Sequence, residues 1–322
     1  MQGIDAYKQL IEKEITELKI KDEPSGLYSP ITYLLGLGGK RMRPILSMMS
    51  AELFGGNPKE ALNSGLAIEL FHNFSLIHDD IMDNAPLRRG YPTVHTKWSE
   101  KTGILSGDAL FVVAYHYLAQ NTVTYLNTLL HTFSVRVMEV CEGQQMDMDF
   151  ETRDDVSIDE YIEMIRLKTS VLLGAALEMG AIVADASRDD VQRIYSFGEN
   201  VGIAFQLQDD ILDLYADPDK FGKQVGGDIL ANKKTFLLLK AFELADNDQQ
   251  KKLQELSEEV DEQMKVEETR KIFDQLGVRE LARIEMERHY ALALESMELV
   301  TASVEKKKPL LKVAEYLMNR EV

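Results

Sequence analysis

The sequence predicts an all-α fold, built around two aspartate-rich segments of identical spacing. Apolar residues recur with helical periodicity through most of the 322 residues. We find no run of alternating β-branched residues bounded by hairpin turns. The pattern DDxxD occurs twice, at 79–83 and 209–213, each time within an apolar segment. With no stretch that looks like a linker, we expect a single helical domain over residues 1–322.

Composition excludes several classes of protein. Hydrophobic residues make up 45% of the chain, enough for a large core, and the formal net charge of -18 disfavours nucleic acid or an anionic membrane as a partner. The single Cys141 excludes an intramolecular disulfide and suits a reducing compartment, so we expect a cytoplasmic protein. Residues 1–21 lack the apolar core of a signal peptide, and no stretch approaches the roughly 20 apolar residues that span a bilayer.

Each helix is bounded by recognisable signals. Residues 21–30 are predicted to form a loop because they contain prolines and a glycine, glycines break the chain at 36–39, and 84–92 is predicted to be loop. Gly107 lies in a small-residue segment that permits close helix packing. In the N-terminal half we expect helices at 3–20, 31–36, 44–54, 58–83, 94–98, 101–122 and 124–150.

The C-terminal half continues in the same way. Ser157 followed by Glu160 predicts a capping box that opens a helix, and 217–232 is predicted to be a loop containing proline and glycine. Residues 246–270 are highly charged and predict a solvent-exposed helical pair. The other helices are expected at 157–184, 187–214, 234–245, 278–304 and 309–320.

Helical spacing gives the aspartates a common direction. Positions i and i+4 share a helix face, so Asp79 and Asp83 project together, as do Asp209 and Asp213. A pair of this kind usually lies on a solvated face, but here the flanking residues are apolar. Several carboxylates buried together need compensating cations. Oxygen ligands without cysteine suit Mg²⁺, which often shares phosphate oxygens with a substrate, so the implied ligand is a diphosphate.

Basic clusters follow the aspartate helices or lie in the glycine-rich turn, where they can donate to phosphate oxygens. They are Lys40, Arg41 and Arg43; Arg88 and Arg89; and Lys223, Lys233 and Lys234. Lys168 lies in an apolar helix and calls for an anionic partner. For Thr169 by itself, a hydrogen bond to the backbone would explain a polar residue in an apolar helix. We interpret His78 as a structural residue, and both a structural and a functional role stay open for His72.

Six sequence blocks, taken in order, resemble the trans-isoprenyl diphosphate synthases of the polyprenyl synthetase family over residues 36–240. A lone DDxxD is a weak signal, whereas the ordered set is highly specific. The blocks are GGKRMRP at 38–44, DDIMD with APLRRG at 79–90, GQQMDMD at 143–149, LKTS at 167–170, FQLQDDILD at 205–213 and GKQVGGDILANKKTF at 222–236. Phe236 replaces a frequent tyrosine, and the C-terminus lacks the strongly basic tail of some farnesyl synthases.

The resemblance implies an isoprenoid synthase-type helical bundle around a central cavity and a homodimer. It also implies condensation of isopentenyl diphosphate with an allylic diphosphate (dimethylallyl, geranyl or farnesyl), with three Mg²⁺ ions. Implied metal ligands are Asp79, Asp83 and Asp209, with Asp80, Asp210 and Asp213 in support. Implied contacts to isopentenyl diphosphate are Lys40, Arg43, His72 and Arg89, and those to the allylic diphosphate are Arg88, Lys168, Gln206, Lys223 and Lys233. Thr169 is also implied as a contact to the allylic diphosphate, and the oxygens of Thr169 and Gln206 would stabilise the allylic cation. The implied catalytic residues are Lys168, Thr169, Gln206, Asp79, Asp80, Asp83 and Asp209.

Residues ahead of the first motif bear on product length. Phe74 and Phe71 lie five and eight residues before Asp79, on one helix face, where their rings would form the floor of a tunnel for the growing chain. An aromatic residue at that position, followed by the small Ser75, resembles the short-chain enzymes. The alternative is that both rings fill the core. We expect geranylgeranyl diphosphate as the product, with farnesyl diphosphate as the alternative.

Other functions fit the motifs less well. A class I terpene cyclase has a similar first motif but usually a different second one, and a non-catalytic partner subunit typically lacks the acidic motifs. A metal-dependent phosphohydrolase would explain the aspartates but not the long apolar helices.

Overall fold

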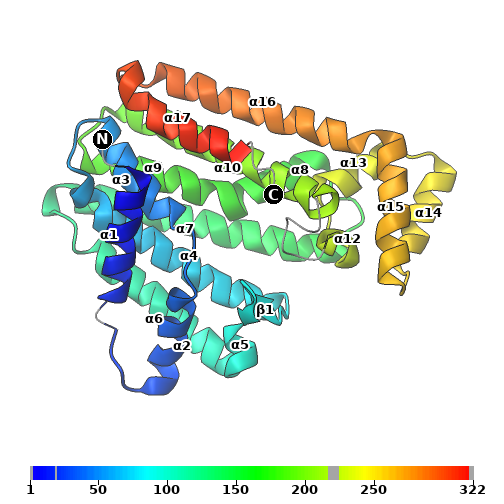
Figure 1. Ribbon diagram of the computed structural model, residues 1–322, viewed down its shortest axis with the longest axis horizontal. Helices are drawn as coiled ribbons and strands as arrows, with labels where there is room; N and C mark the ends of the chain where they lie inside the picture. The colour runs from blue at the N-terminus through cyan, green and yellow to red at the C-terminus, as the bar shows by residue number, and fades with distance from the viewer. Residues whose placement is uncertain (1–2, 19, 217–224, 319–322) are drawn as a thin grey trace. The chain divides into compact units, whose positions relative to one another are not determined.

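The computed structural model describes residues 3–18, 20–216 and 225–318, and over these residues the fold is all-α as predicted (Figure 1). The first helices are α1 (Ile4–Thr16), α2 (Ser25–Gly36), α3 (Met42–Leu53), η1 (Pro58–Ala61), α4 (Leu62–Met82), α5 (Val94–Lys97), α6 (Glu100–Leu118) and α7 (Val123–Thr152). They are followed by α8 (Ile158–Ile165), η2 (Arg166–Ser170), α9 (Val171–Val183), α10 (Arg188–Tyr215), α12 (Gly227–Leu230) and α13 (Phe236–Leu244). The last are α14 (Asn247–Ser257), α15 (Glu262–Leu276), α16 (Val278–Leu299) and α17 (Val304–Met318).

The chain divides into two compact units. Unit 1 is drawn from Met1–Val137, Ala175–Tyr195 and Thr301–Lys306, and unit 2 from Met138–Gly174, Ser196–Val300 and Lys307–Val322. Helices α7, α9, α10 and α17 each contribute residues to both units. The expectation of one domain over 1–322 stays a prediction, as does the central cavity.

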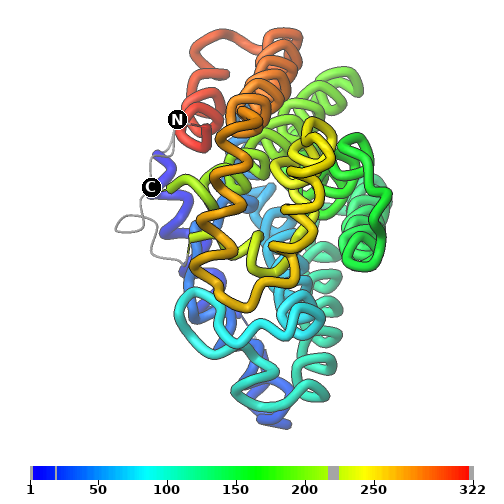
Figure 2. The backbone as a smooth tube through the Cα atoms, turned by 90° about the vertical axis from the view of Figure 1, so that its right-hand side faces the viewer, coloured from blue at the N-terminus to red at the C-terminus, as the bar shows by residue number. Residues whose placement is uncertain are grey.

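Helix α4, which carries the first aspartate motif, packs along α6 in unit 1 (Figures 1 and 2). Glycines on α6 permit this close approach: a Cβ at Gly103 would lie 2.8 Å from Ile81 Cδ1, and one at Gly107 would clash with the His78 ring. The expectation of close packing around Gly107 is therefore confirmed. The α4 residues facing inward, among them Leu66, Ile68 and Leu70, are fully buried.

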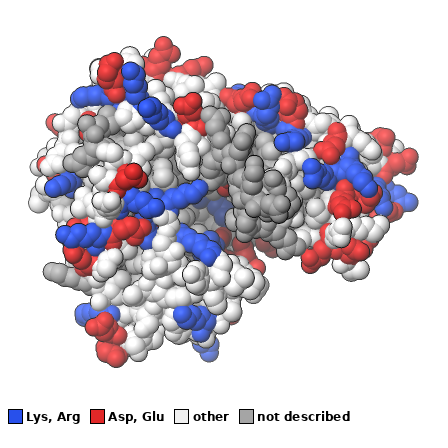
Figure 3. Space-filling model, in the orientation of Figure 1, with Lys and Arg blue, Asp and Glu red and all other residues white. Residues whose placement is uncertain are grey.

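In unit 2, α14 and α15 form the charged helical pair expected from the sequence. Acidic and basic side chains are interspersed over these two helices (Figure 3), as is typical of a solvated surface. Both begin with an aspartate cap, because the Asp246 and Asp261 carboxylates accept from the backbone N–H groups of Gln249 and Met264.

Several local expectations were wrong. The helix expected at 278–304 ends at Leu299, and the described part of the expected loop 217–232 contains α12, whereas residues 217–224 lie outside the described residues. Helix α2 begins at Ser25, directly after Pro24, so the predicted loop through Pro30 is mostly helix. The predicted loop 84–92 contains a short antiparallel pair, β1 (Leu87–Arg88) and β2 (Tyr91–Pro92). The predicted continuous helix 157–184 is interrupted by one π-helical turn, η2. Such turns are rare and concentrate at functional sites.

Candidate active site

The first aspartate motif lies at the C-terminal end of α4 in unit 1. Asp80 is 1% exposed and Asp79 is partly exposed, whereas Asp83 is exposed and caps the helix. The backbone N–H of Asp83 donates to the carbonyl of Asp79 at 2.9 Å. Asp79 and Asp83 are therefore one helical turn apart, as the spacing predicted.

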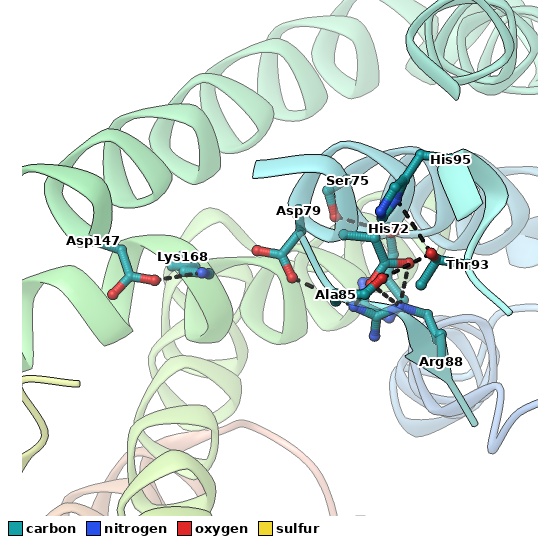
Figure 4. A network of polar contacts seen from close by, with 10 residues as sticks. His72, Ser75, Asp79, Ala85, Arg88, Thr93, His95, Asp147 and Lys168 are labelled. Carbon is teal, nitrogen blue, oxygen red and sulfur yellow. Dashed lines mark hydrogen bonds and ion pairs between the residues drawn. The ribbon is translucent and has the colours of Figure 1, made fainter. Parts of the chain in front are cut away.

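Arg88 returns to this motif from the β1–β2 hairpin. Its Nε donates to both carboxylate oxygens of Asp80, and its Nη2 lies 3.5 Å from Asp79 Oδ2 (Figure 4). Burial raises the pKa of Asp80, and the hydrogen bonds from Arg88 oppose that rise. The pKa of Arg88 is raised, because Asp80 and Asp79 outweigh the effect of its own burial. Asp80 thus binds Arg88, and its supporting role in metal binding stays a prediction.

A tight turn projects Arg89 from the same hairpin. Arg89 and Gly90 both have positive φ, 54° and 80°, which is the backbone pattern of the two-residue type I′ hairpin turn. The guanidinium lies on the glycine-rich turn before α3: Arg89 donates to the carbonyl of Gly38, and a Cβ at Gly39 would lie 3.1 Å from Arg89 Nη2. A side chain at residue 39 would crowd the guanidinium, and the φ of 149° at this position also favours glycine.

The basic residues of the glycine-rich turn have different environments. Arg41 is buried and contacts Glu12, Glu69 and the carbonyl of Leu35, so it ties the turn to α1 and α4. In contrast, the buried Nε of Arg43 has no hydrogen-bond partner among the described residues. An orphaned guanidinium donor in this position suits an anionic ligand.

His72 lies in the positive field of these arginines. Burial lowers its pKa well below the ordinary value, and the charges of Arg43 and Arg89 lower it further. The imidazole is therefore neutral at neutral pH, and an anion bound nearby would meet the positive charge of the arginines. Unit 1 thus brings Arg43, His72 and Arg89 into electrostatic contact.

Aromatic rings fill the space between α4 and α6. Phe74 stacks on Phe111 of α6, with ring centroids 5.0 Å apart and an angle of 16°, and Phe71 lies 5.4 Å from Phe74. Ser75 donates its hydroxyl to the carbonyl of His72 at 2.9 Å. Sequence reasoning missed Phe111, because the helix that would face Phe74 could not be read from the pattern.

The second aspartate motif lies on α10 in unit 2, where its carboxylates have different environments. Asp210 is buried and accepts from Gln206 Nε2 at 3.2 Å and from the hydroxyl of Tyr161. Asp213 accepts from the backbone N–H of Asp228 at 3.0 Å and so caps α12. Burial and the charge of Asp228 raise the pKa of Asp210 to about 7, against the opposing effects of Tyr161, Gln206 and Lys233.

The π turn η2 presents Lys168 and Thr169. Lys168 Nζ lies 2.6 Å from Asp147 Oδ2 on α7 (Figure 4), and Thr169 Oγ1 donates to Gln206 Oε1 at 3.5 Å. Gly143 permits this approach of α7, because a Cβ there would clash with the Lys168 backbone. The anionic partner expected for Lys168 is thus Asp147, which lies in the block at 143–149 and has no role predictable from the sequence pattern.

Lys233 follows α12, and its backbone N–H donates to the carbonyl of Asp228 at 2.9 Å. Its charge acts on Asp210. The neighbouring Lys234 donates instead to the carbonyl of Phe150 at 2.9 Å. Lys223 lies outside the described residues.

The aspartate carboxylates suit a metal ion that takes only some of its ligands from the protein and the others from a bound substrate. No group of three or more histidine, cysteine or carboxylate side chains is arranged to hold a metal within residues 3–18, 20–216 and 225–318. Mg²⁺ commonly takes one or two carboxylates and completes its octahedron with waters and phosphate oxygens. Asp79 with Asp83, and Asp209, fit that mode of binding.

In the same described ranges, no helix is long and apolar enough to cross a membrane.

Comparison with known proteins decides the family. The model of the family described as polyprenyl synthetase matches residues 24–276. The chain belongs to the polyprenyl synthetase family. A short chain isoprenyl diphosphate synthase from Methanothermobacter thermautotrophicus is 37% identical over 322 residues, covering 100% of this chain and 98% of that protein. A geranylgeranyl diphosphate synthase from Methanosarcina mazei is 42% identical over 235 residues, 72% of each chain.

Solved structures agree with this assignment. The crystal structure of a geranylgeranyl pyrophosphate synthase has a TM-score of 0.95 and 45% identity, covering 100% of both chains. The corresponding enzyme from Pyrococcus horikoshii has a TM-score of 0.93 and 36% identity, covering 99% of this chain and 97% of that one. This polyprenyl synthetase is therefore a short-chain prenyltransferase with the all-α isoprenyl synthase fold.

Proposed function

We propose that this polyprenyl synthetase condenses isopentenyl diphosphate with allylic diphosphates, in a Mg²⁺-dependent reaction, up to geranylgeranyl diphosphate. The observation that carries the product length is the stacked pair Phe74 and Phe111, which would end the tunnel below the first motif. Relatives of high coverage named geranylgeranyl synthases support the same length. Farnesyl diphosphate is the second candidate, because Phe74 lies only five residues before Asp79.

In this proposal Asp79, Asp83 and Asp209 hold Mg²⁺, three ions in all, with Asp80 and Asp213 in support. Asp210, expected from the sequence as a third supporting residue, is treated separately because it accepts from Tyr161 and Gln206. The bound metal supplies positive charge that stabilises the departing diphosphate. Arg88, Lys168 and Lys233 would bind the same diphosphate, together with Lys223, and would stabilise the charge that develops on it as the allylic C–O bond breaks.

Isopentenyl diphosphate would be bound by Lys40, Arg43, His72 and Arg89. The orphaned Arg43 Nε would find its acceptor in this ligand, and the neutral His72 would add a hydrogen bond without competing charge. Binding fixes the isopentenyl double bond for attack on the allylic cation. The oxygens of Thr169 and Gln206 would stabilise that cation.

We further propose that the protein acts in the cytoplasm as a homodimer. Apolar side chains on α6 support a self-association surface: Ile104, Leu105 and Val112 are 42%, 59% and 68% exposed. An exposed apolar group of this kind marks an interaction site in many proteins.

Diphosphate release tests the reaction type. With Mg²⁺, release should require both isopentenyl diphosphate and farnesyl diphosphate, because the leaving group departs only in a productive condensation. Release from farnesyl diphosphate alone, at the same rate, would instead indicate a phosphohydrolase or a cyclase. The prenyl product, analysed by mass, separates those two alternatives.

A further inference from the structure

The phenol of Tyr161 makes a contact that the motifs do not account for. Tyr161 lies on α8, is 1% exposed, and donates its hydroxyl to Asp210 of the second aspartate motif. Its backbone is fixed as well, because Tyr161 N–H donates to the carbonyl of Ser157, and the Ser157–Glu160 capping box opens the helix. The buried ring of Tyr161 therefore projects from a capped helix, with its hydroxyl on Asp210.

Asp210, which accepts from Tyr161, also contacts Gln206. The Gln206 Nε2 donates to Asp210 Oδ1 at 3.2 Å, and the Gln206 Oε1 accepts from Thr169 Oγ1 at 3.5 Å. Asp210 Oδ2 accepts from the Tyr161 hydroxyl while Oδ1 accepts from Gln206 Nε2, so the carboxyl faces the amide nitrogen and the amide oxygen is turned toward Thr169. Rotation of the amide by 180° would place oxygen against oxygen.

The backbone around this chain of contacts is closely packed. A Cβ at Gly202, one turn before Gln206, would lie 2.7 Å from the Ser170 Cα, so α10 approaches the π turn directly. Ser170 donates to the carbonyl of Ile165, within the same turn. The close backbone contact thus restricts movement of Gln206 relative to Thr169. The rotation of the Gln206 side-chain amide is what the backbone leaves undetermined.

We propose that Tyr161 and Asp210 are positioning residues that lock the Gln206 amide with its oxygen toward Thr169, where the allylic cation forms. This inference rests on the proposed function. It gives Asp210 a task different from metal binding, and it adds a residue, Tyr161, 49 positions away in the sequence. A lone Gln206 would sample both amide orientations, and only one presents an oxygen to a cation.

The test is Tyr161→Phe, which removes only the hydroxyl. We expect kcat to fall about tenfold, the equivalent of one hydrogen bond, with the KM of both substrates changed less than twofold. The matched control is Tyr215→Phe, which also removes a tyrosine–aspartate hydrogen bond, to Asp274 at 2.9 Å, on the same unit. We expect this control to keep kcat within twofold of the wild type.

A double-mutant cycle separates positioning from general packing. In a Gln206→Leu background, Tyr161→Phe should lower kcat by less than twofold, because no amide remains to orient. An undiminished tenfold loss in that background would overturn the proposal, as would a Tyr161→Phe enzyme with normal kcat. Wild-type protein that condenses no substrate would refute the proposed function instead, so the two failures are distinguishable.

Mg²⁺ titration distinguishes Asp210 from a metal ligand. In Tyr161→Phe and Asp210→Asn, the Mg²⁺ concentration for half-maximal rate should stay within twofold of the wild type while kcat falls. A tenfold or larger rise in Asp210→Asn would assign Asp210 to the metal and overturn its positioning role. If Tyr161→Phe does not fold, Asp210→Asn with and without Gln206→Leu gives the same cycle and the same criteria.

Discussion

Arg88 and Asp80 form a bidentate ion pair: Arg88 Nε lies 2.9 and 2.8 Å from the two carboxylate oxygens, and Nη2 lies 2.6 Å from Oδ1. The pair connects the β1–β2 hairpin to the end of α4. It holds Arg88 beside Asp79, where an allylic diphosphate is proposed to bind. The central aspartate of the first motif therefore positions an arginine.

Replacing Arg88 by methionine should destabilise the protein. The Asp80 side chain is only 2% exposed, so the substitution leaves a buried carboxylate without its cation. We expect a loss of about 3 kcal/mol in the free energy of unfolding, measured by urea titration. The double variant R88M/D80N should recover part of this loss, and an equal or greater loss would show that the ion pair is not its cause.

Removing a proposed metal ligand should abolish turnover while the fold persists. Asp79→Ala and Asp209→Ala should each lower kcat by a factor on the order of a thousand, because the diphosphate loses charge stabilisation as it departs. Asp189→Ala is the control, since that side chain is 81% exposed on α10 and pairs only weakly with Arg193. Near-normal turnover in Asp79→Ala, with unchanged circular dichroism, would refute the assignment.

Opening the aromatic floor should lengthen the product. Phe74→Ala and Phe111→Ala each remove one ring of the stacked pair, so both should shift products beyond twenty carbons, as read by mass spectrometry. Phe54→Ala, at the C-terminal end of α3, should leave the distribution unchanged. Unchanged products in both Phe74→Ala and Phe111→Ala would show that these rings only fill the core.

Chelation should separate activity from folding. Treatment with EDTA should remove all condensation activity, and added Mg²⁺ should restore it, because the carboxylates need the metal to bind diphosphate. The helical circular dichroism signal should remain, because the core formed by the described residues consists mainly of apolar side chains and does not depend on the metal. Activity that survives exhaustive chelation would contradict a metal-dependent mechanism.

Local signals predicted much of the fold and little of the tertiary pairing. The capping box at Ser157 and Glu160 formed as expected, because it depends on residues three apart. The hairpin was missed because each of its strands has two residues, too few for an alternating pattern. The π turn η2 was missed because its apolar periodicity continues that of the flanking helices.

For the site residues, too, the sequence predicted local relations but not contacts between distant residues. Spacing predicted that Asp79 and Asp83 lie one turn apart, since a helix fixes that relation. It did not reveal Asp147 as the partner of Lys168, or Tyr161 as the partner of Asp210, which are 21 and 49 residues distant. Such partners are set by helix packing, and only the three-dimensional structure identifies them.

The central claim is tested most directly by product length. Purified protein is incubated with Mg²⁺, labelled isopentenyl diphosphate and, separately, dimethylallyl, geranyl or farnesyl diphosphate, and the dephosphorylated products are separated by chain length. A dominant twenty-carbon product from every primer is predicted. Products that stop at fifteen carbons, or no elongation from any primer, would contradict a geranylgeranyl diphosphate synthase.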